Sequence, residues 1–136
     1  MPDFDSIQVG DEATLTRTIT EKDIQAYAAL TGDDNSVHTN KQFAERTRFK
    51  QPIAHGMLTA SLFSAIIGTR LPGHGSLYVS QDLNFKNPVM VDDIIQAKVK
   101  VVQKVESTKM IVLKTTASNQ RSQVVLSGTA KVTWAF

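Results

Sequence analysis

Residues 56–68 read Gly56-Met57-Leu58-Thr59-Ala60-Ser61-Leu62-Phe63-Ser64-Ala65-Ile66-Ile67-Gly68 and form the most apolar helical segment of the chain. Its large apolar side chains cover more than one helical stripe. A helix on the surface of a globular protein needs only one such stripe. We therefore expect this helix to be central and wrapped by other structure. Leu71-Pro72-Gly73 follows closely and is expected to end it.

The residues before this segment predict a strand and a capped helix. Residues 12–19 alternate in polarity, as a half-buried strand does. Thr20 is the expected N-cap of the next helix, with Asp23 near the positive end of the helix dipole. Gly32 can adopt the left-handed conformation and is expected to end this helix.

A shorter helix is expected over residues 40–46, with Phe43 and Ala44 facing inward. The second half of the chain instead predicts strands, over residues 76–85, 95–102, 110–117 and 124–134. Successive strand-turn-strand units favour an antiparallel sheet. We therefore predict a single α+β domain over residues 1–136, with one buried helix against a curved antiparallel sheet.

The composition narrows the classes of function. With 41% apolar and 21% charged residues, the chain has the make-up of a soluble globular protein. It has no cysteine, which excludes disulfides and thiolate chemistry and fits a reducing, cytoplasmic location. The net charge of +2 is spread along the chain, so nucleic acid is not an expected partner. No apolar run is long enough for a membrane span, and the polar start of the chain is unlike a secretory signal.

The loop Gly32-Asp33-Asp34-Asn35-Ser36-Val37-His38 gathers carboxylates, an amide and an imidazole after a helix. Asp33 and His38, five residues apart across a folded loop, can both reach one water molecule. General acid/base chemistry on a water requires such a pair. The structural alternative is that an aspartate caps the next turn and His38 is an ordinary loop residue.

A second feature is Ala54-His55-Gly56-Met57, where a glycine opens the apolar helix. The first N–H groups of a helix have no internal partner and can hold an oxyanion. The alternative is a glycine needed only for tight packing. By itself His55 is interpreted as a buried, hydrogen-bonded histidine. The histidines at 38, 55 and 74 lack zinc-ligand spacing, so no metal is expected.

Together these motifs resemble the R-specific enoyl-CoA hydratase family, also called hydratase 2 or MaoC-like dehydratases. The string from Gly32 to His38 is similar to the family signature, and the likeness continues through residues 54–57, 61–64, 71–73 and 83–89. It covers most of the chain from about Thr20 onward. The resemblance implies the hot-dog fold, in which an antiparallel sheet wraps around a long helix, usually in a homodimer.

The resemblance also implies a reaction. Asp33 and His38 would hold the water that adds to C3 of a trans-2-enoyl thioester, while C2 receives a proton. The product would be an (R)-3-hydroxyacyl thioester. The Gly56 N–H would polarise the thioester carbonyl, Asn35 would hold the loop, and Ser64 would hydrogen-bond the catalytic carboxylate. No cofactor is implied, because coenzyme A or an acyl-carrier phosphopantetheine belongs to the substrate.

The chain departs from the family at Ser36, where proline is usual, and this puts the rigidity of the loop in doubt. Arg48, Lys50 and Lys86 lie near the motifs and are candidates for contacts with the phosphates of coenzyme A. Two other functions stay open. One is an acyl-thioester hydrolase on the same fold. The other is a non-catalytic dimer that binds acyl thioesters.

Overall fold

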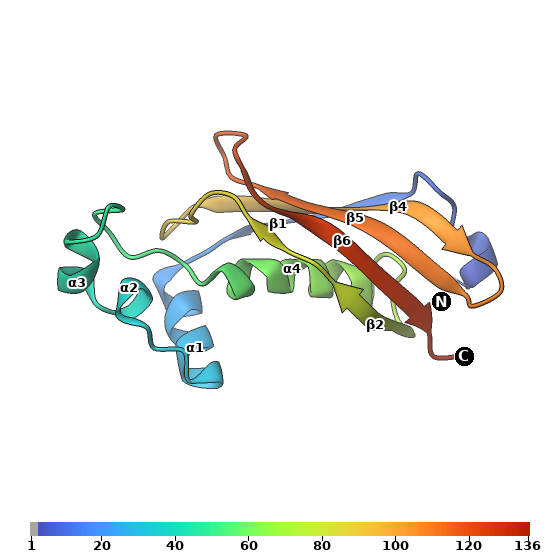
Figure 1. Cartoon of the computed structure of the whole chain (residues 1–136), viewed down its shortest axis with the longest axis horizontal. Helices are drawn as coiled ribbons and strands as arrows, with labels where there is room; N and C mark the ends of the chain where they lie inside the picture. The colour runs from blue at the N-terminus through green and yellow to red at the C-terminus, as the bar shows by residue number, and fades with distance from the viewer. Residues whose placement is uncertain (1–2) are drawn as a thin grey trace.

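The computed structural model describes residues 3–136 and shows short helices followed by one long helix and then a run of strands (Figure 1). The elements, in chain order, are η1 (Phe4–Ser6), β1 (Glu12–Thr18), α1 (Glu21–Thr31), α2 (Ser36–Thr39), α3 (Lys41–Glu45), α4 (Gly56–Thr69), β2 (Ser76–Gln81), β3 (Asn84–Phe85), β4 (Ile94–Val105), β5 (Met110–Ser118) and β6 (Val124–Trp134).

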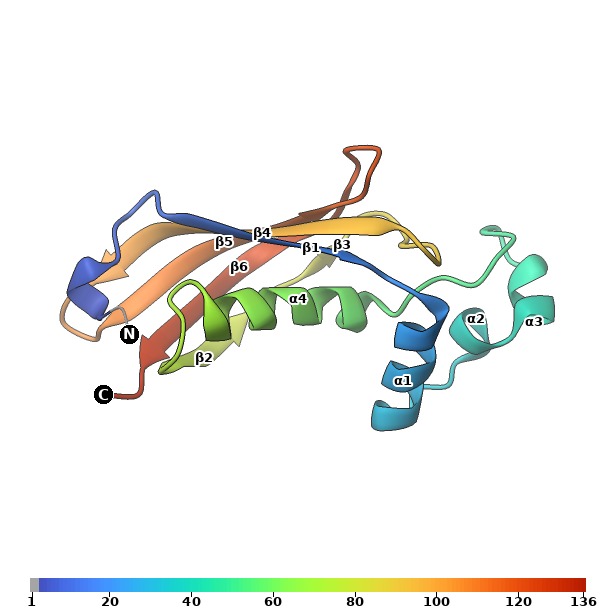
Figure 2. The ribbon, with the colours of Figure 1, turned by 180° about the vertical axis from the view of Figure 1, so that it is seen from behind.

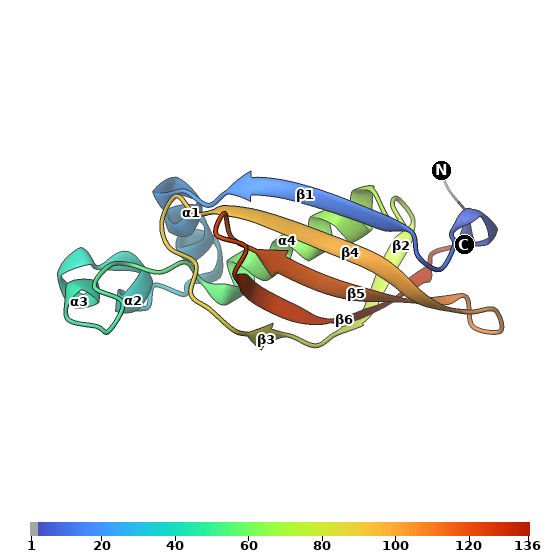
Figure 3. The same ribbon diagram turned by 90° about the horizontal axis from the view of Figure 1, so that it is seen from above.

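The strands form one antiparallel sheet in the order β1-β4-β5-β6-β2, and the short β3 pairs with β6. Figure 3 shows this order from above, with α4 running beneath the strands. The helix buries Phe63, Ile66 and Ile67, each at most 1% exposed, in the same core as the strand residues Val99 and Leu113. The predicted arrangement of one apolar helix against an antiparallel sheet is confirmed.

The prediction that α4 is central and wrapped by the sheet is confirmed, and part of the helix surface stays exposed in a single chain. Met57 is 55% exposed, and Ser61, Ser64 and Ala65 are exposed as well. In Figures 1 and 2 most strands lie above α4 and β2 passes beside its C-terminal half, so the sheet leaves the lower side of the helix uncovered. One face of the helix therefore remains free for further packing.

The predicted helix boundaries around α1 are confirmed. The Thr20 side chain accepts a hydrogen bond from the Asp23 N–H, and the Asp23 carboxylate accepts one from the Thr20 N–H, which completes a capping box. The hydrogen bond from the Thr20 N–H lowers the pKa of the Asp23 carboxyl, and the Arg17 guanidinium 2.7 Å away adds to this, against burial, which raises the pKa. Gly32 ends the helix in the left-handed conformation, with φ at 84°.

The short helix predicted over residues 40–46 is α3, with Asn40 as its N-cap. Ala44 is buried as predicted. Phe43 is 41% exposed, so the prediction that it faces inward is wrong. The Phe43 ring lies at the surface, with the guanidinium carbon of Arg46 5.7 Å from its centroid. The helix α3 has only five residues and lies beyond the end of the sheet, so few other residues can cover its side chains.

The strand predicted over residues 76–85 is split into β2 and β3. Both segments pair with β6, and between them the chain leaves the ladder at Asp82. The backbone of Asp82 passes so close to Gly128 that a Cβ atom on Gly128 would lie 2.0 Å from the Asp82 carbonyl oxygen. The split therefore depends on a tertiary contact with a strand more than 40 residues later.

The short helices α1, α2 and α3 stand together at one end of the sheet, beside the start of α4 (Figures 1 and 2). No helix within residues 3–136 is both long and apolar enough to cross a membrane. The loop that carries Asp33 and His38 thus lies where α4 begins.

Candidate active site

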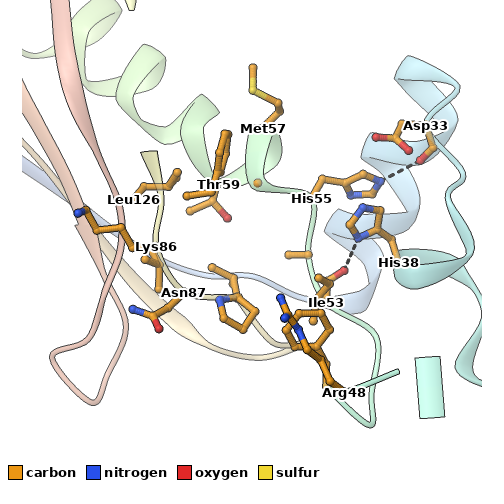
Figure 4. A pocket seen from close by; sticks show the side chains of 17 residues that line it. Asp33, His38, Arg48, Ile53, His55, Met57, Thr59, Lys86, Asn87 and Leu126 are labelled. Atoms are coloured by element: carbon orange, nitrogen blue, oxygen red, sulfur yellow. Dashed lines mark hydrogen bonds between the residues drawn. The ribbon is translucent and has the colours of Figure 1, made fainter. Parts of the chain in front are cut away.

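A cavity of about 420 Å³ opens at the start of α4 and is bounded by three parts of the chain (Figure 4). This volume lies within the usual range for small-molecule sites. The residues that line it are Asp33, His38, Arg48, Phe49, Ile53, Ala54, His55, Gly56, Met57, Thr59, Phe85, Lys86, Asn87, Pro88, Val89, Val125 and Leu126. The cavity therefore joins the Asp33–His38 loop, the first turn of α4 and the strands β3 and β6.

Asn35 organises the loop that carries the acid/base pair. Its side chain accepts a hydrogen bond from the Val37 N–H at 3.1 Å and so caps α2. Its own N–H donates to the Asp33 carboxylate at 3.3 Å, and its carbonyl accepts from the His38 N–H at 2.9 Å. One residue thus ties the backbone of this turn to both candidate catalytic residues.

His38 is held in one tautomer. Its Nδ1 lies 2.6 Å from the carbonyl oxygen of Ile53, which can only accept, so Nδ1 carries the proton. The Nε2 lone pair of the neutral ring is then free. Burial lowers the pKa of His38 below its ordinary value of 6.5, and repulsion by His55 adds to this, against the Ile53 carbonyl and Asp33, which raise it. His38 is therefore neutral at pH 7 and able to accept a proton.

His55 supports this arrangement from behind. It is 2% exposed, and its Nε2 lies 2.9 Å from the carbonyl oxygen of Asp33. Its ring stacks on that of His38 with centroids 3.9 Å apart, and the Tyr27 ring lies 4.7 Å away on α1. The stack fixes the plane of His38, so His55 acts on the site through its neighbours.

Asp33, His38 and His55 bring one possible metal-ligand atom each to within 4.8 Å of one another. The geometry fits a shared ion poorly. The two imidazole planes are only 30° apart, so the in-plane lone pairs of the rings run side by side instead of converging. Two of the four ring nitrogens also already face carbonyl oxygens. The cluster is better suited to hold a water than a cation.

Gly56 begins α4 facing the cavity. Within the described chain no side chain caps this helix, so the first N–H groups, those of Gly56 and Met57, have no helical partner. The ring of Phe85 packs directly on Gly56, because a Cβ atom there would lie 2.4 Å from Phe85 Cε1. A larger residue at this position would have to push the Phe85 ring aside, whereas glycine leaves the ring in place beside the N–H donors at the positive end of the helix dipole.

Only some of the remaining predicted site residues line the cavity. Arg48 and Lys86 line the cavity, whereas Lys50 is not part of its wall. Ser64 lies on the exposed face of α4, and no hydrogen bond joins it to Asp33 within residues 3–136 of one chain. The roles given to Ser64 and to the three basic residues stay predictions.

Sequence reasoning missed three residues of the site. Tyr27 is given no role by the sequence, yet its ring packs on that of His55. Phe85 was quoted within a motif without the contact that covers Gly56. The sequence presents Thr59 as one residue of an apolar helix, and only the structure shows that its hydroxyl is buried without a partner among the described residues.

Comparisons with known proteins identify the family of the chain. The family model described as "MaoC like domain" matches residues 6–123. An (R)-specific enoyl-CoA hydratase of Rhodospirillum rubrum is 44% identical over 95% of this chain and 89% of its own length. A 3-hydroxybutyryl-CoA dehydratase of Methylorubrum extorquens is 43% identical over 95% of this chain and 82% of its own.

Solved structures give the same result. An (R)-hydratase of Aeromonas caviae, described as involved in PHA biosynthesis, superposes with a TM-score of 0.92 at 40% identity, covering 95% of this chain and 98% of its own. An R-hydratase of Pseudomonas aeruginosa gives a TM-score of 0.91 at 37% identity, covering 96% and 84%. This chain therefore belongs to the MaoC-like dehydratase family and has its hot-dog fold.

Proposed function

We propose that the protein is an (R)-specific enoyl-thioester hydratase that also catalyses the reverse dehydration. The observation that carries the proposal is that one cavity is lined by the Asp33–His38 pair and by the uncapped start of α4 at Gly56. The activities for which its relatives are named, a hydratase and a dehydratase of coenzyme A thioesters, support the proposal.

The residues suit the two halves of the reaction. A water held by Asp33 and His38 loses a proton to the free Nε2 of His38 as its oxygen bonds to C3 of the enoyl group. The C2–C3 π bond breaks, and its electrons move toward the thioester oxygen, where the Gly56 N–H stabilises the developing charge. A proton returned from the pair to C2 completes the addition of water, so no cofactor is needed.

The rest of the cavity suits an acyl thioester of coenzyme A. Val89, Val125 and Leu126 offer an apolar wall for the acyl chain, and Arg48 and Lys86 offer cations for the phosphates of the carrier. The absence of cysteine supports a cytoplasmic, reducing location.

We further propose that the protein works as a homodimer. β2 lies at the edge of the sheet and exposes Leu77 and Val79, which are 51% and 52% exposed. The other edge strand, β1, is rich in threonine and charge instead. An apolar edge favours pairing with a second copy of the same strand. Sedimentation of the purified chain measures its mass in solution. A monomer at micromolar concentration would contradict the proposed homodimer.

The decisive experiment follows the enoyl absorbance of crotonyl-CoA while assaying free thiol. Hydration predicts a loss of absorbance without thiol and an (R)-configured product, whereas a hydrolase would release thiol. Asp33→Asn and His38→Ala should each lower kcat by about 10²- to 10⁴-fold with the circular dichroism spectrum unchanged. Wild-type turnover in either variant would refute the proposed site.

A further inference from the structure

Thr59 carries a buried hydroxyl for which residues 3–136 provide no hydrogen-bond partner. It lies in the first turns of α4, is 0% exposed, and lines the cavity. Its Oγ1 makes no hydrogen bond with any described residue. Two other helical threonines bond the carbonyl four residues earlier, Thr31 to Tyr27 at 2.7 Å and Thr69 to Ala65 at 2.6 Å. Thr59 departs from this local rule.

The carbonyl that Thr59 would use is already occupied. The oxygen of His55 accepts the N–H of Leu58 at 3.1 Å and that of Thr59 itself at 3.3 Å. The hydroxyl is turned away from this carbonyl, and Figure 4 shows the Thr59 oxygen facing the middle of the cavity. A buried hydroxyl left unpaired costs free energy, so a ligand that supplies an acceptor there gains an interaction that the empty site lacks.

The position of Thr59 identifies what that acceptor is. Thr59 follows Gly56 by three residues, so both lie on the same face of α4. Helical side chains lean toward the N-terminus of their helix, which brings the hydroxyl toward the free N–H of Gly56. The Thr59 donor and the Gly56 donor thus converge on one region of the cavity.

We propose that the Thr59 hydroxyl donates a second hydrogen bond to the thioester carbonyl oxygen, beside the Gly56 N–H. This inference rests on the proposed hydratase function and adds a residue to it. The hydroxyl donates to the thioester oxygen of the bound substrate. This hydrogen bond becomes stronger in the transition state because negative charge collects on that oxygen. Its main effect is therefore on kcat, with a smaller effect on KM.

The Nδ1 atom of His55 is an alternative acceptor for the Thr59 hydroxyl and has to be distinguished from the thioester carbonyl. It is also buried without a partner and lies four residues before Thr59 along the helix. The two atoms are not hydrogen-bonded to each other, so the Thr59 donor is available to substrate. If the hydroxyl served His55 instead, it would act on the histidine stack and leave the thioester carbonyl untouched.

The test compares Thr59→Val, which removes the hydroxyl at nearly constant volume, with Thr59→Ser, which keeps it. With crotonyl-CoA, Thr59→Val should lower kcat by roughly 10- to 100-fold with little change in KM, while Thr59→Ser should stay near wild type. The melting temperature of Thr59→Val should not fall, because the substitution removes an unpaired polar group.

Infrared difference spectra give the readout that a purely structural role would not move. Crotonyl-CoA carrying ¹³C at the thioester carbonyl is bound to the Asp33→Asn variant, which cannot turn it over. Adding Thr59→Val should shift the carbonyl stretch to higher frequency, since one hydrogen bond is lost. An unshifted band, or unchanged kcat in Thr59→Val while Asp33→Asn is inactive, would overturn this inference and leave the proposed function standing. A wild-type protein without hydratase activity would refute the function itself.

Discussion

The contact between Gly56 and Phe85 makes Gly56→Ala an informative substitution. The new Cβ atom would lie 2.4 and 2.5 Å from Phe85 Cε1 and Cδ1. Carbon atoms prefer a separation of about 3.5–4.0 Å, so the ring has to move by about 1 Å or more. Phe85 is 56% exposed and belongs to a two-residue edge strand, so it can swing outward.

The expected loss of stability is therefore small. Forcing a methyl group into a packed site costs about 1–3 kcal/mol, and an exposed neighbour places this case at the low end. Alanine also favours a helix over glycine by up to about 1 kcal/mol. We expect the free energy of unfolding to fall by about 1 kcal/mol or less. Activity is more sensitive, because a 1 Å displacement of groups that position substrate can lower turnover by about 10²-fold.

Urea unfolding followed by the fluorescence of Trp134, the single tryptophan, measures the free energy of unfolding. The rate of crotonyl-CoA hydration measures the activity. The matched control is Phe85→Ala, which removes the atoms that the new methyl meets. In that background Gly56→Ala should cost no stability and little further activity. An equal loss of activity in both backgrounds would refute the steric reasoning, and the loss would then have to arise at the Gly56 amide itself.

Two further predictions concern the catalytic loop. Burial lowers the pKa of His38, and the neutral ring is the active form, so kcat/KM should fall toward acid pH with a midpoint below 6.5. A midpoint at or above pH 6.5 would contradict the role of His38 as the base. The same shift makes the contribution of His38 to folding stability complete above pH 6.5 and lost as the pH falls through its lowered pKa. Ser36→Pro should raise the free energy of unfolding by about 0.4–1 kcal/mol, because Ser36 is the first residue of α2 and Asn35, at φ −45° and ψ 130°, already has the conformation that precedes proline. Urea unfolding checks this, and a destabilised variant would show that the loop does not accept the ring.

The sequence predicted the parts of the fold that local rules control. The capping box of Thr20, the left-handed Gly32 and the apolar period of residues 56–68 each depend on near neighbours in the chain. The split at Asp82 depends on Gly128 in another strand, and the exposure of Phe43 depends on how little α3 meets in space. Neither could be read from a local pattern.

The same distinction applies to the site. The loop string pointed to Asp33 and His38, since the residue types needed for acid/base chemistry stand close together in sequence. The structure brings both to the wall of one cavity, together with Gly56. Thr59 and Phe85 escaped notice because an unpaired hydroxyl and an aromatic ring over a glycine are properties of packing.

The segment from Ile53 to Gly56 explains why serine can stand at position 36. The Ile53 N–H donates to the Val37 carbonyl at 3.2 Å, and the Ile53 carbonyl fixes His38. Two residues later His55 holds the carbonyl of Asp33, and the next residue begins α4. The segment is itself anchored, because the Ala54 N–H donates to the Val89 carbonyl at 2.7 Å.

Four consecutive residues thus set the acid/base loop in register with the amide that faces the cavity. The loop is held by contacts from outside itself, so a proline within it is not the main source of its rigidity. Replacing Ser36 by proline should therefore change the stability of the folded state while leaving kcat within about twofold. A large rise in kcat in Ser36→Pro would mean instead that the loop is mobile in the wild-type protein and that the Ile53–Gly56 segment does not position it.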